Sequence, residues 1–358
     1  MLRVAAALSL FLIATWTEPV RQPREVLQGV SLSLEAFQTE GGHKVGGVLS
    51  RPKGARGRLP GALLVGWLSC DSVETAADGN QDGFARLLHA IAEQSGFVFL
   101  RVEKPGIAEG DSPRCEENDF QTDLAAYRAG LKALAARPDV DPARIFLVGL
   151  SLGGGIAPLV AGDFPVAGYV VSGGWAKTWL EHMLELERRR LALSGVSPGE
   201  VNRAMTGFAD FYSLYLNQRL KPGDVTRIRP DLKALWYDDP GSQYGRPAAF
   251  FHQLQALNVA EAWQRVRAPV LAVYGEHDWI MSRDDHELIA RWVNRSQAGL
   301  AKLVVIPRMD HFYMAHATPE QAFRDEPKGC YTADAEREIV GWLRHAADSV
   351  GAGGKGRE

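Results

Sequence analysis

Hydrophobic and polar residues alternate regularly in two short segments near the start of the chain. The segments are "GVSLSLEAF" (residues 29–37) and "HKVGGVLSRP" (residues 43–52), and "QTEGG" separates them. Alternation with a period of two is typical of strands that bury one face, and a link containing glycine fits a turn. The two segments therefore predict an antiparallel hairpin.

From residue 61 onward, continuous apolar runs alternate with amphipathic stretches. The runs predict strands at residues 61–67, 97–103, 144–150, 166–173, 268–275 and 301–307. The amphipathic stretches predict helices at residues 83–96, 119–138, directly after Ser151, up to 294, and at 333–347. Strands that are apolar throughout and alternate with helices indicate a parallel sheet covered on both faces, which is an α/β fold.

The alternation stops between about Trp175 and Trp263, where the chain is mainly helical and rich in aromatic residues and prolines. We therefore expect a helical cap (residues 175–263) inserted between two parts of one α/β core (residues 30–174 and 264–348). Residues 349–358, which end in "GAGGKGRE", are expected to be a disordered tail.

The composition changes this picture little. Hydrophobic residues make up 46% of the 358 positions and the net charge is −3. Such a balance is ordinary for a folded protein and argues against binding to nucleic acid or to an anionic membrane. A local basic cluster, "ERRR" at Glu187–Arg190, is interpreted as a solvated helix face.

The first 17 residues differ from the rest of the chain. Arg3 precedes an apolar run from Val4 to Ala14, which is short for a membrane span and suits the core of a signal peptide. We expect an exported protein, periplasmic or secreted, with an uncleaved N-terminal anchor as the alternative. Apart from that anchor we expect no membrane domain, and the sequence leaves the oligomeric state open.

A candidate nucleophile lies where the strand "RIFLV" meets the helix "LGGGIAPLV". Gly149-Leu150-Ser151-Leu152-Gly153 matches the pattern G-x-S-x-G between a strand and a helix, where a tight turn exposes the serine and needs glycines on both sides. The helix N-terminus also favours developing negative charge. The alternative is tight packing of the strand against the helix, without chemistry.

A serine nucleophile requires a base and a group that orients the base. Asp278 follows the strand "VLAVYG" and His311 follows the strand "KLVVIP", so both lie at carboxyl ends of the sheet. The competing residues Glu276, His277 and Asp310 are interpreted as surface turn residues. The remaining histidines are interpreted as surface or capping residues: His89, His252, His286 and His316.

In their order, the elbow "GLSLGG", the turn "GEHD" and the late "DH" resemble the α/β-hydrolase superfamily, from about Val30 to Ala347. Within it, the chain is similar to bacterial esterases and to serine aminopeptidases. The resemblance implies a triad of Ser151, Asp278 and His311, with Leu152 as one backbone donor of an oxyanion hole. Relatives often carry His-Gly-x in the second donor loop, where this chain has Val65-Gly66-Trp67. By register Trp67 is the second donor, with Leu68 as the alternative.

The three cysteines do not form a metal-binding pattern, and no metal or organic cofactor is expected. Cys70 lies in the oxyanion loop and Cys115 lies in the loop after the next strand. Because neighbouring strands bring these loops to one edge of the sheet, we expect a Cys70–Cys115 disulfide in an exported protein. Cys330 would remain free.

The predicted function is hydrolysis of carboxylic esters, or of thioesters, with an apolar acyl group. Most aromatic residues of the cap should form its own core, and some should face the serine. The alternative is a peptidase whose cap acids hold a free amine, and the candidates are Glu181, Glu185 and Glu187. These acids also have arginine neighbours suited to pairing within the helix. A binding protein without catalysis is the third option, which the complete set of triad residues disfavours.

Overall fold

The structure is a computed structural model that describes residues 21–75, 82–107, 113–325 and 328–354. The expected signal peptide or anchor, residues 1–17, lies outside the described residues. In the part of the chain that is described, no helix is long and apolar enough to cross a membrane.

Within the described residues, eight strands form one sheet in the order β1-β2-β4-β3-β5-β6-β9-β10. The strands are β1 (Val30–Gln38), β2 (Lys44–Pro52), β3 (Leu59–Val65), β4 (Val98–Val102), β5 (Val140–Leu150), β6 (Gly168–Ser172), β9 (Val270–Gly275) and β10 (Ala301–Ile306). The predicted hairpin is confirmed, because β1 and β2 pair antiparallel from Val30–Pro52 to Gln38–Lys44. Among these eight strands β2 runs against the others, and the six from β4 to β10 are parallel.

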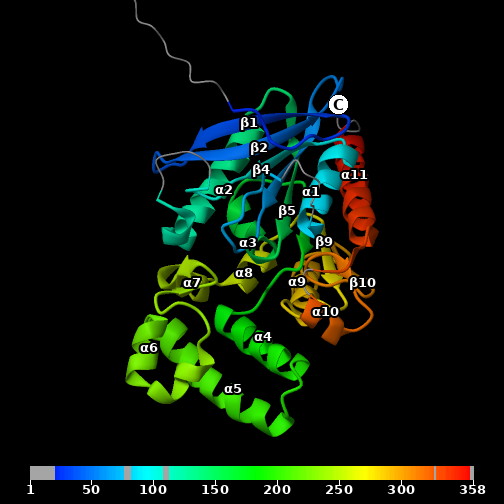
Figure 1. The fold of residues 1–358 in the computed structure, drawn as a ribbon. Helices are drawn as coiled ribbons and strands as arrows, with labels where there is room; N and C mark the ends of the chain where they lie inside the picture. Colours follow the sequence, from blue (N-terminus) through cyan, green and yellow to red (C-terminus); the bar gives the residue numbers. More distant parts are fainter. Residues whose placement is uncertain (1–20, 76–81, 108–112, 326–327, 355–358) are drawn as a thin grey trace, which may run out of the picture.

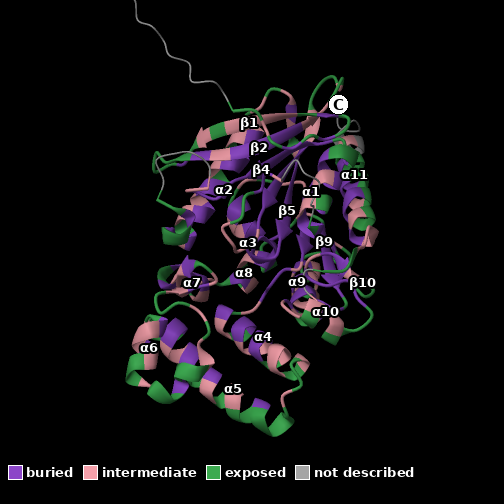
Figure 2. Cartoon of the chain, in the orientation of Figure 1, coloured by how far each residue is buried: buried purple, intermediate pink, exposed green. Residues whose placement is uncertain are grey.

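Helices cover both faces of the sheet (Figure 1). One face carries α1 (Gly83–Gln94) and α11 (Asp334–Gly354), and the other carries α2 (Phe120–Ala135), α3 (Leu152–Ala161), α8 (Val259–Gln264) and α9 (Arg283–Asn294). Side chains of β5 alternate between the two faces: Leu147 packs with α2 and α3, whereas Phe146 and Val148 pack with α1 and α11. The central strands are buried throughout (Figure 2), which explains their continuous apolar sequence.

The segment between β6 and β9 is mainly helical and gathers at one end of the molecule (Figure 1). Besides α8 it contains α4 (Trp179–Leu193), α5 (Pro198–Tyr212), the π-helical turn η2 (Ser213–Asn217), α6 (Pro222–Ile228), the 3-10 helix η3 (Pro230–Leu235) and α7 (Ala248–Gln255). A two-residue pair of strands, β7 (Ser242–Gln243) and β8 (Arg246–Pro247), lies between η3 and α7. This matches the predicted helical segment, and its outer helices α5 and α6 carry the exposed surface (Figure 2).

The remaining short elements follow the strands of the sheet. They are η1 (Cys115–Glu117), α10 (Pro319–Asp325) and the antiparallel pair β11 (Met314–Ala315) and β12 (Cys330–Tyr331). Strand β11 begins three residues after His311.

The predicted start of the disordered tail at residue 349 is wrong. Helix α11 continues to Gly354, and the Ser349 hydroxyl donates to the carbonyl of His345 one turn earlier. Once a helix has formed, each added residue gains a hydrogen bond at little further cost, so glycines at the end do not stop it at once. Residues 355–358 lie outside the described part.

Candidate active site

Ser151 lies between the end of β5 and the start of α3 in a strained backbone conformation. Its φ is 55° and its ψ is −123°, and its N–H donates to the Ser172 carbonyl at 2.9 Å. A residue with a side chain rarely adopts a positive φ, so the surrounding structure must hold it there. Such strain at a serine is the geometry that a nucleophile elbow requires.

The flanking glycines are required by their neighbours. A Cβ at Gly149 would lie 2.6 Å from the Gly153 carbonyl oxygen, and one at Gly153 would lie 1.9 Å from that of Val65. Further along α3, a Cβ at Gly155 would lie 2.3 Å from the indole nitrogen of Trp175. The first two glycines therefore form the elbow, and the later one gives room for the chain that leaves β6.

The structure brings Ser151, His311 and Asp278 into one hydrogen-bonded series. His311 Nε2 lies 3.0 Å from Ser151 Oγ, and His311 Nδ1 lies 2.8 Å from Asp278 Oδ2. Asp278 follows β9 and His311 follows β10, so both side chains come from the carboxyl ends of parallel strands, as the sequence predicts. All three residues are buried.

Asp278 is held as an anion by its hydrogen bonds. Its Oδ1 accepts the N–H groups of Ile280 at 2.9 Å and Met281 at 2.8 Å. Burial alone would raise the pKa of Asp278, but the charge of His311 and these hydrogen bonds outweigh it and lower the pKa below its usual value. An ionised Asp278 accepts a hydrogen bond from Nδ1–H of His311, which leaves Nε2 unprotonated and able to accept a proton from Ser151.

Asp310 and His316 lie near the site. The sequence analysis assigned both residues to the surface, but the structure shows that both are buried. Asp310 accepts the N–H groups of Phe312 and Met314, both at 2.8 Å, and pairs with His316 at 2.9 Å. It therefore shapes the turn that carries His311. Its position beside that histidine is the available sequence signal, but burial of the turn depends on distant chain segments.

Of the other histidines assigned to the surface, His286 is fully buried. Its Nε2 accepts the N–H of Gly174 at 3.0 Å, and its Nδ1 lies 2.8 Å from the carbonyl of Ser282. His89 lies in a partly buried polar cluster, and His252 is half-buried. His286 therefore fixes the chain after β6, a tertiary contact without a local sequence signal.

A cavity of about 650 Å³ opens beside Ser151 and His311. Trp67, Leu68 and Leu152 line it, so the structure places both predicted oxyanion donors and the alternative Leu68 at the serine's cavity. The N–H of Leu152 has no partner within α3, because Leu152 is the first residue of the helix. The N–H of Gly66 donates to the Tyr127 hydroxyl at 3.1 Å and is therefore occupied.

The segment after β6 forms one wall of this cavity through α4 and the loops after η3 and β7: Trp179, His182, Leu186, Arg190, Tyr237 and Tyr244. Most of the other aromatic residues predicted for the cap form its buried core: Trp175, Phe208, Phe211, Tyr212, Tyr215, Phe250 and Phe251. The division between core and cavity-lining aromatics therefore follows the sequence prediction.

The cluster Glu187–Arg190 is not the solvated helix face that the sequence suggested. Glu187 is fully buried, and Arg190 pairs with it at 2.7 Å and lines the cavity. Arg189 donates to the carbonyls of Trp279 and Ile280 at 2.8 and 2.7 Å. The two hydrogen bonds of Arg189 bind α4 to the loop after β9.

The three acids proposed for amine recognition are engaged elsewhere. Glu181 caps the N-terminus of α4 through Thr178, and Glu185 pairs with Lys177 at 2.5 Å. The cavity wall formed by the described residues includes neither of them, nor Glu187. The acids that do line the cavity come from the core: Asp71, Glu74 and Asp82.

The predicted disulfide is confirmed: Cys70 and Cys115 are bonded, and Cys330 is free and exposed. The buried guanidinium of Arg246, in β8, contacts Cys115 Sγ at 2.7 Å and pairs with Asp123 at 2.8 Å. The disulfide therefore joins the loop after β3 to the loop after β4, and Arg246 of the segment between β6 and β9 contacts it. No pattern in the sequence indicated the role of Arg246.

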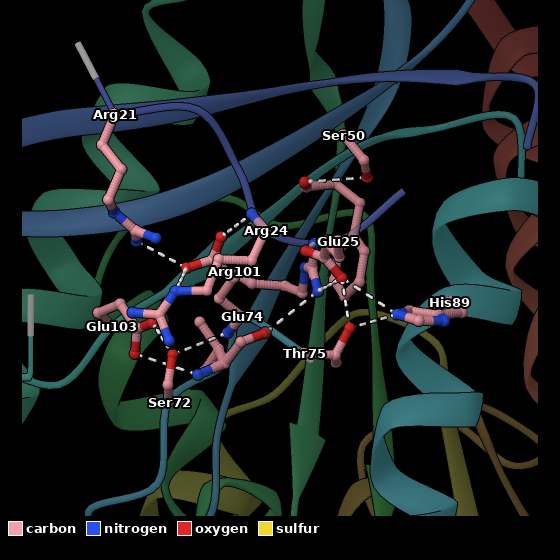
Figure 3. Close-up of polar contacts among 12 residues, drawn as sticks. Arg21, Arg24, Glu25, Ser50, Ser72, Glu74, Thr75, His89, Arg101 and Glu103 are labelled. Atoms are coloured by element: carbon pink, nitrogen blue, oxygen red, sulfur yellow. Dashed lines mark hydrogen bonds and ion pairs between the residues drawn. The ribbon is translucent and has the colours of Figure 1, made fainter. Parts of the chain in front are cut away.

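The loop after β3 is also held by a buried polar cluster (Figure 3). Arg101 of β4 is fully buried and pairs with Glu25, whose carboxylate also contacts Thr75 at 2.7 Å and His89 at 3.0 Å. Glu103 accepts the N–H of Val73 at 3.1 Å. Residues near the start of the described chain thus fix the loop that carries Trp67.

No group of three or more His, Cys, Asp or Glu side chains among the described residues is placed to hold a metal ion. The polar groups at Ser151 instead form the hydrogen-bonded series described above.

A family model, the alpha/beta hydrolase family, matches residues 63–326. Esterase EstD of Thermotoga maritima is 22% identical over 298 residues, which are 83% of this chain and 65% of that protein, so the chain spans about two thirds of this relative.

Solved structures with the same fold include the hypothetical protein PA2218 of Pseudomonas aeruginosa (17% identity, 96% of this chain and all of that one, TM-score 0.54). Another is the esterase domain of a Rhodothermus marinus protein (16% identity, 88% and 98% coverage, TM-score 0.51). A third is Est1E of Butyrivibrio proteoclasticus (13% identity, 89% and 99% coverage, TM-score 0.53). The family match covers most of the chain, including all three residues of the hydrogen-bonded series. The chain therefore belongs to the alpha/beta hydrolase family.

Proposed function

We propose that the protein is a serine hydrolase that cleaves carboxylic esters through an acyl-enzyme. The observation that carries the proposal is the series from Ser151 Oγ through His311 to Asp278, with distances of 3.0 and 2.8 Å, at the wall of a 650 Å³ cavity. A nucleophile, a base and an orienting acid within hydrogen-bond reach are what acyl transfer requires.

In the proposed reaction Ser151 Oγ attacks the acyl carbon while His311 Nε2 takes the hydroxyl proton. Asp278 stabilises the imidazolium that forms. The N–H groups of Leu152 and Trp67 bind the oxyanion of the tetrahedral intermediate, a contribution of typically about 3 kcal/mol per donor. His311 then protonates the departing alcohol. Water, deprotonated by His311, releases the acid and restores Ser151.

The cavity favours an ester with an apolar part, and thioesters are a second option. Its walls include Phe84, Leu88, Trp179, Leu186 and Phe312. We propose that residues 175–263 act as a cap that roofs this cavity, since four side chains of α4 line it. Similarity to EstD and to solved esterases supports ester hydrolysis as the reaction class.

The peptidase alternative needs a carboxylate for the free amine of a peptide. Asp71 and Asp82 on the core side of the cavity are the acids that favour it. The cap acids do not favour it, because Glu185 and Glu187 are paired with basic side chains. A role in binding without catalysis leaves the strained serine and its hydrogen-bonded histidine without a purpose.

We also propose export, with residues 1–17 as a signal peptide or anchor. The Cys70–Cys115 disulfide supports this location, because disulfides persist in oxidising compartments and are rare in the cytosol.

The test is hydrolysis of p-nitrophenyl esters from acetate to palmitate beside aminoacyl-p-nitroanilides, with labelling by a fluorophosphonate. We expect ester turnover and labelling that both disappear in Ser151→Ala, with a loss of at least about 1,000-fold in kcat. Ser69→Ala, which removes a hydroxyl from the same cavity, is the matched control. Turnover of anilides in preference to esters would favour the peptidase, and absence of labelling would overturn the proposal.

A further inference from the structure

The cap wall of the cavity ends in an arginine. Trp179, His182, Leu186 and Arg190 all line the cavity, and their spacing of three, four and four residues places them on one face of α4. The stripe runs for about 16 Å along the helix at 1.5 Å per residue. An apolar wall therefore leads from the N-terminal end of α4 to a guanidinium near its C-terminal end.

Arg190 is fixed in place before any ligand arrives. Its Nε and Nη2 donate to Oε2 of Glu187 at 2.8 and 2.7 Å, and its guanidinium lies 4.9 Å from the ring centre of Tyr237. The side chain is 30% exposed, and the residue lines the cavity. A pre-oriented guanidinium loses little entropy when it binds a carboxylate, which makes it a suitable anion receptor.

Glu187 does not face the ligand. Its side chain is fully buried, and its Oε1 accepts the hydroxyls of Tyr212 at 3.2 Å and Tyr237 at 2.7 Å. The Glu187 carboxylate therefore has its hydrogen-bond partners within the protein. Arg190 lines the cavity and Glu187 does not, so a molecule in the cavity contacts the guanidinium and not the acid.

Polar nitrogens without a partner occur among the described side chains that line the rest of the cavity. The indole nitrogens of Trp179 and Trp279 and Nδ1 of His182 are buried without a hydrogen-bond partner among the described residues. All three side chains line the cavity, and Trp179 and His182 are each only 2% exposed. An indole nitrogen can only donate, so its missing partner is an acceptor. Buried polar groups without partners are rare and call for an explanation.

We propose that this end of the cavity is a carboxylate subsite, and that the substrate is an ester whose end remote from the scissile bond carries a carboxylate that binds Arg190. The inference rests on the proposed esterase function. Half-esters of dicarboxylic acids carry the carboxylate on the acyl part, and esters of hydroxy acids carry it on the alcohol part. Both present the same chemistry to Arg190.

The experiment compares kcat/KM for carboxylate esters with that for their neutral methyl-ester isosteres, in both arrangements, with chains of four to ten carbons. We expect the wild type to prefer the carboxylate by about 10- to 100-fold at the best length, the range of a charge-assisted hydrogen bond. Arg190→Gln should remove this preference, mainly through KM for the carboxylate ester. Arg190→Lys should retain part of it.

Arg188→Gln is the matched control, because Arg188 is exposed on the same helix and does not line the cavity. If the role of Arg190 is purely structural, Arg190→Gln would lower kcat/KM equally for the carboxylate ester and for the neutral ester. That result, or a wild type without preference, would overturn the subsite while leaving neutral-ester turnover and labelling intact. If the wild type neither hydrolyses the neutral ester nor reacts with the fluorophosphonate, the esterase proposal itself would be overturned.

Discussion

Gly153 lies directly against the end of β3: a Cβ atom there would stand 1.9 Å from the carbonyl oxygen of Val65. Backbone atoms cannot yield to such an overlap without moving the strand or the elbow. The contact ties the nucleophile elbow to the loop that carries Trp67, since Trp67 lies two residues beyond Val65.

We therefore expect Gly153→Ala to lower esterase kcat by at least about 100-fold and to destabilise the fold by more than 2 kcal/mol, because small-to-large changes against backbone are strained. Gly341→Ala is the control: a Cβ at that exposed position inside α11 meets nothing within 4 Å. It should stabilise by about 0.5–1 kcal/mol. Urea unfolding measures the stability of the two variants, and ester turnover measures their kcat. Equal stability and equal kcat in Gly153→Ala and Gly341→Ala would show that the contact with Val65 does not require a glycine.

Local patterns explain why the elbow was predictable from the sequence. Ser151 directly follows the last residue of β5 and Gly153 lies two residues later, so one short stretch of sequence contains both the turn and the glycines that it needs. Asp278 and His311 were predictable for a related reason, because each follows a strongly apolar strand and parallel strands share one edge.

Burial of polar residues was not predictable in the same way. His286 is buried because Gly174, 112 residues earlier, needs an acceptor for its N–H. Arg190 faces the cavity because Glu187 is buried against Tyr212 and Tyr237. Such contacts depend on how distant segments meet, and a sequence of charges along a helix does not contain that information.

The proposed oxyanion donor is a backbone group, so the two parts of Trp67 can be tested separately. Trp67→Phe keeps the N–H and should retain kcat within about tenfold. Trp67→Pro lacks the N–H and should lower kcat by about 100- to 1,000-fold. Thermal unfolding of Trp67→Pro checks that the loop still folds. If Leu68→Pro loses activity and Trp67→Pro does not, the role belongs to Leu68.

The Cys70–Cys115 disulfide closes a loop with a sequence separation of 45 residues. Its removal in Cys70→Ala/Cys115→Ala should destabilise the protein by about 2–4 kcal/mol. Activity should fall as well, because Cys70 lies in the loop that carries Trp67. Urea unfolding with and without reductant measures the effect, and Cys330→Ser, at an exposed free cysteine, should change nothing. Three alkylatable thiols in the folded protein without reductant would contradict the bond.

The Glu25–Arg101 pair should give the protein a specific acid sensitivity (Figure 3). Burial by itself would raise the pKa of Glu25, but the hydrogen bond to His89 and the charge of Arg101 outweigh it and lower the pKa from 4.5 to about 2. A pKa lowered by folding stabilises the protein above the unfolded value of 4.5, and this stability is lost as the pH falls toward 2.

Glu25→Gln should therefore cost about 3 kcal/mol of unfolding free energy at pH 7, where the full shift counts, and about 2 kcal/mol at pH 3.5. Urea unfolding at both pH values measures the difference. Glu338→Gln is the matched control, since Glu338 is exposed and lies 3.9 Å from Lys302, and it should cost less than about 0.5 kcal/mol at either pH. A Glu25→Gln penalty that stays constant between pH 7 and 3.5 would mean that the carboxylate stabilises the loop by packing and not by its charge.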